Sequence, residues 1–156
     1  PLAVGNGQDL YARRKMAEAS YMAGMSFSNA GLGVCHAIAH QVGARYKIPH
    51  GVANALLLPE VMRFNMLVCQ EALREIARAF NLRVEHLDGK DAALKAIEAV
   101  RELTASIGLP TRLEQVGARS ADFGTLAAQA MEDPTLQTNP RQVSQADVLE
   151  ILQRSL

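Results

Sequence analysis

The sequence predicts an all-α protein, a single helical bundle spanning residues 1–156. Leucine and alanine dominate the composition and aromatic residues make up 4% of it. Alternating runs of β-branched residues, which are typical of strands, are scarce. Apolar residues instead recur every three or four positions in several segments that end at glycine, proline or capping residues. A chain of this length also buries a hydrophobic core of its own.

The first helix is expected over residues 11–28, with Asp9 as its N-terminal cap. Its predicted buried face consists of apolar residues at helical spacing, namely Ala12, Met16, Ala19, Ala23 and Phe27. The glycines of "NAGLG" then break this helix or open a second one, which carries His36 and His40 and ends at Gly43.

A connector is expected over residues 44–49, because a proline at position 49 disfavours helical geometry at the residue before it. A third helix begins at His50 and is expected to kink at Pro59. Further helices are predicted over residues 71–80, 90–107 and 120–131. Ser144, followed three residues later by Asp147, predicts a capped final helix.

Composition excludes several classes of protein. The formal net charge is zero, whereas nucleic acids and anionic membranes require a basic face, so neither is an expected partner. No uninterrupted apolar run is long enough to span a bilayer, and no secretory signal is visible. Cys35 and Cys69 are too few for a disulfide scaffold, which predicts free thiols and a cytoplasmic location. The first nine residues, beginning at Pro1, read as a loop within a longer chain.

Three of the four histidines lie within "GVCHAIAHQVGARYKIPHG", residues 33–51. His36 and His40 share one helix face, and His50 joins them if the connector folds back. Imidazoles converging from two helices are a common way to hold a divalent metal. The alternative is that these are hydrogen-bonded core histidines. A zinc-protease motif is excluded, because Ala37 stands where the general-base glutamate would follow the first histidine.

Small residues surround the histidines and predict room for another group to approach the two helices. We expect a shallow apolar groove here, in which the three histidines are accompanied by small residues, namely Ala37, Gly51 and Ala53.

The segment "NAGLGVCHAIAHQVGARYKIPHGVANALLLPEVMRFN", residues 29–65, resembles the metal-site block of the iron-containing (group III) alcohol dehydrogenases. It is most similar to the lactaldehyde reductase and propanediol dehydrogenase branch. The flanking "DLYARRKMAEASYMAGMSFSNAGLG" and "DPTLQTNPRQVS" resemble the same family, so the resemblance covers essentially the whole chain. It implies the C-terminal helical domain of a two-domain, dehydroquinate synthase-like enzyme whose N-terminal nucleotide-binding domain is absent from this chain.

The resemblance also implies an oxidoreductase that transfers hydride between a small alcohol, or its aldehyde or ketone, and NAD or NADP. His36 and His50 match metal ligands for Fe²⁺ or Zn²⁺, and His40 matches a catalytic histidine that also contacts the nicotinamide cofactor. The family's other two ligands lie outside this chain, so the chain alone is expected to be inactive. The implied partners are the substrate, the missing domain and further copies in a homo-oligomer.

Two other interpretations remain open from the residues themselves. One is a free-standing helical metalloprotein or hydrolase with a three-histidine site at His36, His40 and His50. The other is a non-enzymatic helical interaction module in which these histidines only pack.

Overall fold

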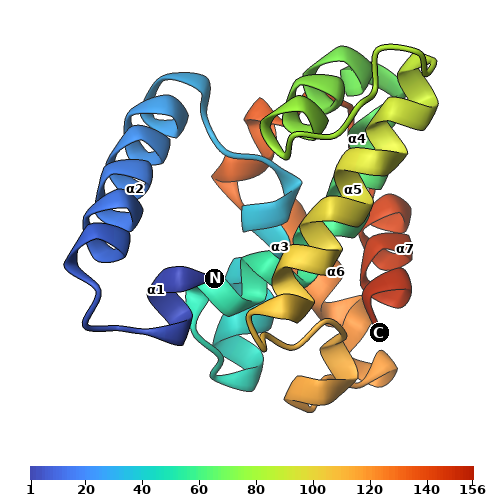
Figure 1. Cartoon of the computed structure of the whole chain (residues 1–156). Coiled ribbons are helices and arrows are strands. Elements are labelled where there is room, and N and C mark those ends of the chain that lie inside the picture. Colours follow the sequence, from blue (N-terminus) through green and yellow to red (C-terminus); the bar gives the residue numbers. More distant parts are fainter.

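The computed structural model describes residues 1–156 as helices joined by loops, without a β-strand (Figure 1). The predicted all-α fold is therefore confirmed. The α-helices are α1 (Leu2–Gly5), α2 (Leu10–Ala30), α3 (Val34–Tyr46), α4 (His50–Ala79), α5 (Gly89–Ser106), α6 (Phe123–Met131) and α7 (Gln145–Ser155). Three short 3-10 helices are η1 (Leu113–Val116), η2 (Ser120–Asp122) and η3 (Pro134–Thr138).

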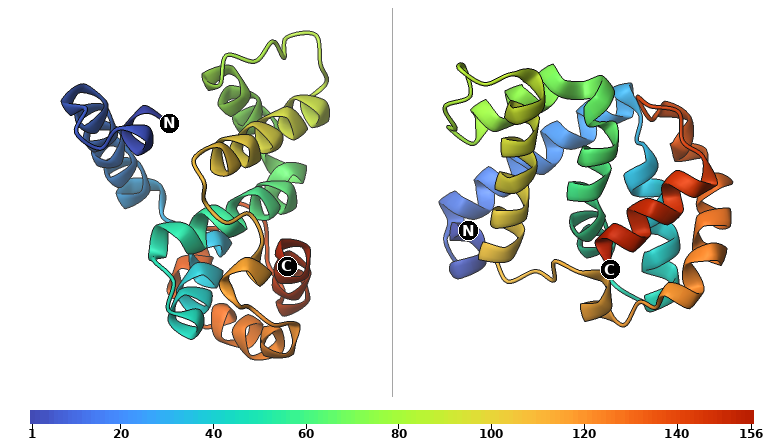
Figure 2. Two further views of the ribbon diagram at one scale, coloured as in Figure 1. Left: turned by 60° about the horizontal axis from the view of Figure 1, so that its bottom comes forward. Right: turned by 90° about the vertical axis from the view of Figure 1, so that its right-hand side faces the viewer.

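Helix α2 begins where the sequence predicts, because the Asp9 carboxylate accepts a hydrogen bond from the backbone N–H of Ala12 at 3.0 Å. Its predicted buried face is wrong. Only Ala12 is buried, while Met16 and Phe27 are 57% and 46% exposed. Helix α2 stands apart from the main body and lies beside the short α1 (Figures 1 and 2). The apolar spacing is present, but no other element of the chain packs over it.

Helix α3 continues to Tyr46, three residues beyond the predicted end at Gly43. Its C-terminal cap is Lys47, whose φ of 55° is left-handed. Gly43 lies within the helix and does not end it, and a Cβ atom there would make an ordinary contact, 3.5 Å from the backbone carbonyl oxygen of Ile48. The chain thus turns tightly from α3 into α4 across the Pro49 connector.

Helix α4 joins the helix that the sequence predicts from His50 onward to the separate helix that it predicts over residues 71–80. The expected kink at Pro59 is wrong: the backbone stays helical there and departs from helical geometry at Cys69, with φ −126° and ψ 22°. Pro59 is buried, and packing around it offsets the lost backbone hydrogen bond. The break falls in the part of α4 that packs against the second core, and the helix changes direction there (Figure 2).

The chain has two hydrophobic cores that share α4. The first joins α3, the first half of α4, α6 and α7, and its fully buried members include Ile38, Leu57 and Phe123. The second joins the far half of α4 to α5, through residues such as Ala77 and Ile97. By length and composition α4 resembles a membrane span, with a mean hydropathy of 1.3 over 18 residues. In the structure 44% of this window is buried, whereas Leu67 and Val68 are 66% and 58% exposed.

The C-terminal part follows the predicted pattern with two additions. The segment expected as one helix over residues 120–131 divides into η2 and α6. Helix α7 has the predicted capping box, in which Ser144 accepts from the Asp147 N–H and the Asp147 carboxylate accepts from the Ser144 N–H. The loop between α6 and α7 contains the short η3, which lies against the start of α3.

Candidate functional site

The three predicted histidines meet in space. His36 and His40 project from α3 and His50 is the first residue of α4. Their ring centroids lie 6.0 Å apart for His36 and His40, 5.2 Å for His36 and His50, and 5.4 Å for His40 and His50. The i, i+4 spacing on α3 and the turn at Lys47 bring this about, and the predicted convergence is confirmed.

The histidines differ in exposure. His36 is half-buried, whereas His40 and His50 are exposed. Burial lowers the pKa of His36, and the nearby His50 and His40 rings lower it further because their positive charges would repel that of His36. The neutral imidazole is the form that binds a metal ion. The lowered pKa therefore favours the neutral form of His36.

Asp133 is an acidic residue that contacts the histidine cluster, and the sequence pattern does not predict this contact. The carboxylate of Asp133 lies 2.8 Å from Nδ1 of His40, and the Asp133 side chain is 9% exposed. Burial alone would raise the pKa of Asp133, but hydrogen bonds from Thr135 and His40 outweigh it and the pKa is lowered. The "DPT" sequence around Asp133 indicates a cap before a helical turn, and nothing in it indicates a partner 93 residues away.

Asn54 lies one helical turn after His50 on α4. Its amide nitrogen donates to the backbone carbonyl of His50 and lies 3.1 Å from His50 Nε2. Its Oδ1 atom is buried without a hydrogen-bond partner. The thiol of Cys35 lies 3.7 Å from the carbonyl oxygen of Asn54, and burial raises its pKa to about 12. Burial therefore favours the neutral thiol at Cys35.

The spacing of His36 and His50 fits a shared metal ion. Two imidazoles bound to one tetrahedral ion through nitrogen place their ring centroids roughly 5 Å apart, and these centroids are 5.2 Å apart. No group of three His, Cys, Asp or Glu side chains in the chain is arranged to hold an ion. The residues thus fit part of a metal site, and the three-histidine alternative gains no support from the geometry.

The small residues near the histidines do not line a groove, so that expectation is wrong. Ala37 and Ala53 are completely buried in the first core, and only Gly51 is exposed. The two alanines have no room for larger side chains because α3 and α4 pack closely at this point.

Two other glycines lack the side chains that would block close packing of the η3 loop against the start of α3. Gly31 has a φ of 78°, and a Cβ atom there would collide with Thr138. A Cβ atom on Gly33 would lie 2.9 Å from the side-chain oxygen of Asn139. That oxygen accepts a hydrogen bond from the N–H of Val34 at 3.2 Å, and so caps a helix whose own N-cap residue, Gly33, has no side chain.

A polar network continues from Asn139. Its amide exchanges hydrogen bonds with that of Asn65 on α4, at 3.2 and 3.0 Å, and donates to the carbonyl oxygen of Arg141 at 2.7 Å. Arg141 in turn donates to the carbonyl oxygen of Phe64, and its guanidinium lies 4.0 Å from the Phe64 ring centroid. The loop carrying Asp133 is thereby fixed to both α3 and α4.

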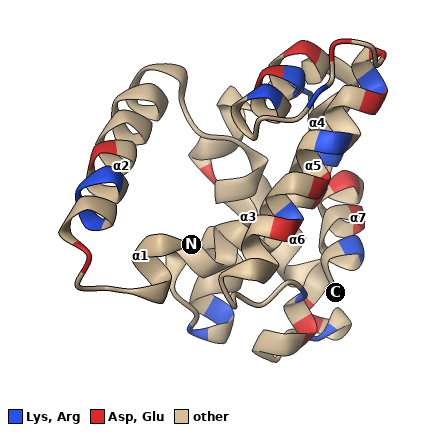
Figure 3. Ribbon diagram, viewed as in Figure 1, with Lys and Arg blue, Asp and Glu red and all other residues tan.

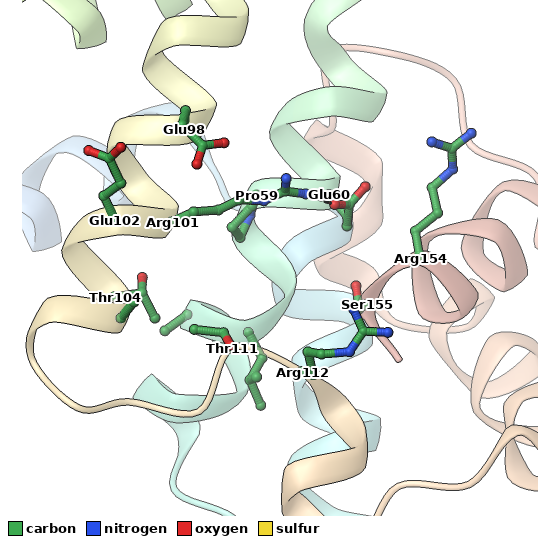
Figure 4. A pocket seen from close by; sticks show the side chains of 13 residues that line it. Pro59, Glu60, Glu98, Arg101, Glu102, Thr104, Thr111, Arg112, Arg154 and Ser155 are labelled. Carbon is green, nitrogen blue, oxygen red and sulfur yellow. Dashed lines mark hydrogen bonds and ion pairs between the residues drawn. The ribbon is translucent and has the colours of Figure 1, made fainter.

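A hollow with a volume of about 410 Å³ lies on another part of the surface, among α4, α5 and α7 (Figure 4). It contains none of the three histidines. At its floor the buried Glu60 pairs with Arg101, and Arg63 lies 3.6 Å from the same carboxylate. Arg112 and Arg154 at the rim pair with glutamates outside the hollow. The side chains that line it include no histidine and no cysteine.

The whole of residues 1–156 matches the model of the "Fe-containing alcohol dehydrogenase family, C-terminal". The chain belongs to the iron-containing alcohol dehydrogenase family. Among its relatives, the probable alcohol dehydrogenase EutG of Escherichia coli is 55% identical over 144 residues, 92% of this chain and 35% of that protein. The 1,3-propanediol dehydrogenase of Citrobacter freundii is 43% identical over 153 residues, 98% of this chain and 40% of that protein.

The solved structures agree with this assignment to the iron-containing alcohol dehydrogenase family. A crystal structure of a 1,3-propanediol oxidoreductase superposes with a TM-score of 0.97 and 41% identity, covering 99% of this chain and 41% of that one. This chain therefore spans about two fifths of the length of its relatives, and its fold is that of their C-terminal helical domain. Because 99% of the chain superposes, the detached position of α2 also has a counterpart in a much longer protein.

Proposed function

We propose that this chain forms the metal-binding helical part of an alcohol dehydrogenase that transfers hydride between a small alcohol, or its aldehyde or ketone, and NAD or NADP. The observation that supports the proposal most strongly is the convergence of His36, His40 and His50, with ring centroids no more than 6.0 Å apart, in a member of this family. No observation of similar weight favours the alternative of a non-enzymatic helical interaction module.

In this proposal His36 and His50 hold Fe²⁺ or Zn²⁺ through neutral ring nitrogens. The lowered pKa of His36 favours that form. When bound, such an ion lowers the pKa of an alcohol hydroxyl and stabilises the alkoxide from which hydride leaves. The remaining ligands come from residues outside this chain, because no third side chain here completes the set.

His40 receives the proton that the alcohol loses. Its ring lies 5.4 Å from the His50 ring, and it is 39% exposed, so a proton can pass on from it to solvent. The nicotinamide ring is expected beside His40, with most of the dinucleotide bound by the other domain. The free thiols of Cys35 and Cys69 suit a cytoplasmic enzyme, and further copies of the chain assemble as a homo-oligomer.

The test uses the full-length protein and measures metal content together with alcohol-dependent NAD(P) reduction. His36→Ala and His50→Ala each remove one ligand and are expected to lower metal retention and activity together. His40→Ala is expected to retain the metal and to lose turnover. His86→Ala is the matched control, because His86 is the one histidine outside the cluster and is exposed in a loop.

Loss of metal in His40→Ala would contradict the assignment and restore the three-histidine site. Retention of full metal and activity in both His36→Ala and His50→Ala would refute the proposed function.

A further inference from the structure

Asp133 is the acidic residue that contacts the histidine cluster, and none of the sequence motifs assigns it a function. Its carboxylate Oδ2 lies 2.8 Å from Nδ1 of His40. The His40 side chain is 39% exposed and that of Asp133 only 9%. A buried carboxylate beside an exposed imidazole is a strong, charge-assisted hydrogen-bond partner.

The carboxylate is held in place by contacts that do not involve His40. Its other oxygen, Oδ1, accepts from the backbone N–H of Thr135 at 2.9 Å and from the Thr135 hydroxyl at 2.6 Å. The same loop is fixed further along, where Thr138 donates to the carbonyl oxygen of Leu32 and Asn139 caps Val34. These contacts fix the segment that follows Asp133, and Oδ2 is left to face His40.

This contact determines which nitrogen of His40 carries hydrogen. An ionised carboxylate only accepts hydrogen bonds, so Nδ1 of His40 is the donor. In the neutral ring, Nε2 then carries the lone pair. Nε2 makes no hydrogen bond within the chain. His40 is thus presented as an acceptor on the side away from Asp133.

We propose that Asp133 is a positioning residue that keeps His40 in the tautomer with hydrogen on Nδ1, so that Nε2 receives the proton released by the alcohol. The inference rests on the proposed dehydrogenase function. When the alcohol is oxidised, its hydroxyl proton passes to Nε2, its carbon-bound hydride passes to the oxidised nicotinamide, and the carbonyl product forms. The imidazolium that results donates from Nδ1 to the Asp133 carboxylate, which offsets its charge.

A purely structural role for Asp133 as the cap of η3 makes different predictions. In Asp133→Asn, the amide oxygen still accepts from the Thr135 N–H, so the cap is retained. The amide nitrogen then faces His40 and donates to Nδ1, which moves the ring hydrogen to Nε2. The substitution keeps the fold and reverses the tautomer, and so separates positioning from capping.

The first measurement is the ¹⁵N chemical shifts of the His40 ring in full-length protein labelled at histidine and purified without added metal. The signals are assigned by their loss in His40→Gln and recorded above the ordinary histidine pKa. We expect hydrogen on Nδ1 in the unchanged protein and on Nε2 in Asp133→Asn. An unchanged tautomer in Asp133→Asn would overturn the inference, whatever the activity.

The second measurement is kinetic. Asp133→Asn is expected to lower kcat about 10²-fold or more, which is the range of general acid–base contributions, with the KM for the alcohol within about threefold of its starting value. The matched control is Asp147→Asn, which alters an equivalent capping carboxylate at the start of α7 and should leave kcat unchanged. Equal losses in the two variants would also overturn the inference. Absence of alcohol oxidation in the unchanged protein would refute the proposed function, while the tautomer measurement would still decide the inference about Asp133.

Discussion

Asn139 provides a sharp test of how the α6–α7 loop is attached to the rest of the fold. Its side chain takes part in four hydrogen bonds: from Val34 N–H, from and to the Asn65 amide, and to the carbonyl oxygen of Arg141. A neutral hydrogen bond contributes about 0.5–1.5 kcal/mol net. Asn139→Ala is therefore expected to lower the free energy of unfolding by about 2–6 kcal/mol, of which about 1 kcal/mol is the lost helix cap.

The assay is urea unfolding of Asn139→Ala, Asn65→Ala and the double variant. The Asn65 and Asn139 amides share two hydrogen bonds. Each single variant loses both bonds, so the sum of the two single losses counts them twice, whereas the double variant counts them once. The single losses should therefore sum to about 1–3 kcal/mol more than the double loss. Asn29→Ala is the control, because its amide makes a single exposed bond to the carbonyl oxygen of Met25 and should change stability by less than about 1 kcal/mol. Strict additivity of the Asn139 and Asn65 losses would refute the reasoning.

Further predictions concern packing, acid stability, self-association and metal affinity. Leu57→Ala should lower the free energy of unfolding by about 2–5 kcal/mol, while Leu58→Ala, at a 38% exposed position next to it, should cost clearly less in the same urea assay. Hydrogen bonds from Ser144 lower the pKa of Asp147 in the folded chain. The ionised Asp147 therefore contributes its full stabilisation above the ordinary aspartate pKa, and this contribution is lost as the pH falls through the lower pKa of the folded chain. In thermal melts below pH 4, Asp147→Asn should lose less stability than the unchanged protein does. The apolar side chains exposed on α2 should make the chain self-associate, and Met22→Glu should reduce this in sedimentation experiments. Calorimetric titration of the chain with Zn²⁺ should show only weak binding, and tight one-to-one binding would contradict the incomplete ligand set.

The features that the sequence predicts correctly are the local ones. Helix periodicity, the Asp9 cap and the Ser144–Asp147 box depend on residues a few positions apart, and so does the pairing of His36 with His40. The position of His50 follows from the short connector that ends at Pro49. Each of these features depends on residues that lie close together in the sequence.

The features that the sequence does not predict depend on residues brought together by the fold. Asp133 reaches His40 across 93 residues and Asn139 reaches Val34 across 105, and neither partner leaves a local signal. The exposure of α2 is missed for a related reason. Periodicity indicates that a helix has an apolar face, but what covers that face is a property of the assembled molecule (Figure 3 shows how few charged residues the far half of this helix carries).

The shared helix α4 has a consequence for the order in which the molecule assembles. The second core joins neighbouring stretches of chain, α4 and α5, whereas the first core must bring α3 together with α6 and α7. Contacts between distant residues form late, because the entropy of closing a long loop is lost before they can stabilise it. On the ribosome, His40 emerges 93 residues before Asp133. The histidine cluster therefore lacks its acidic partner until the chain has been made as far as Asp133.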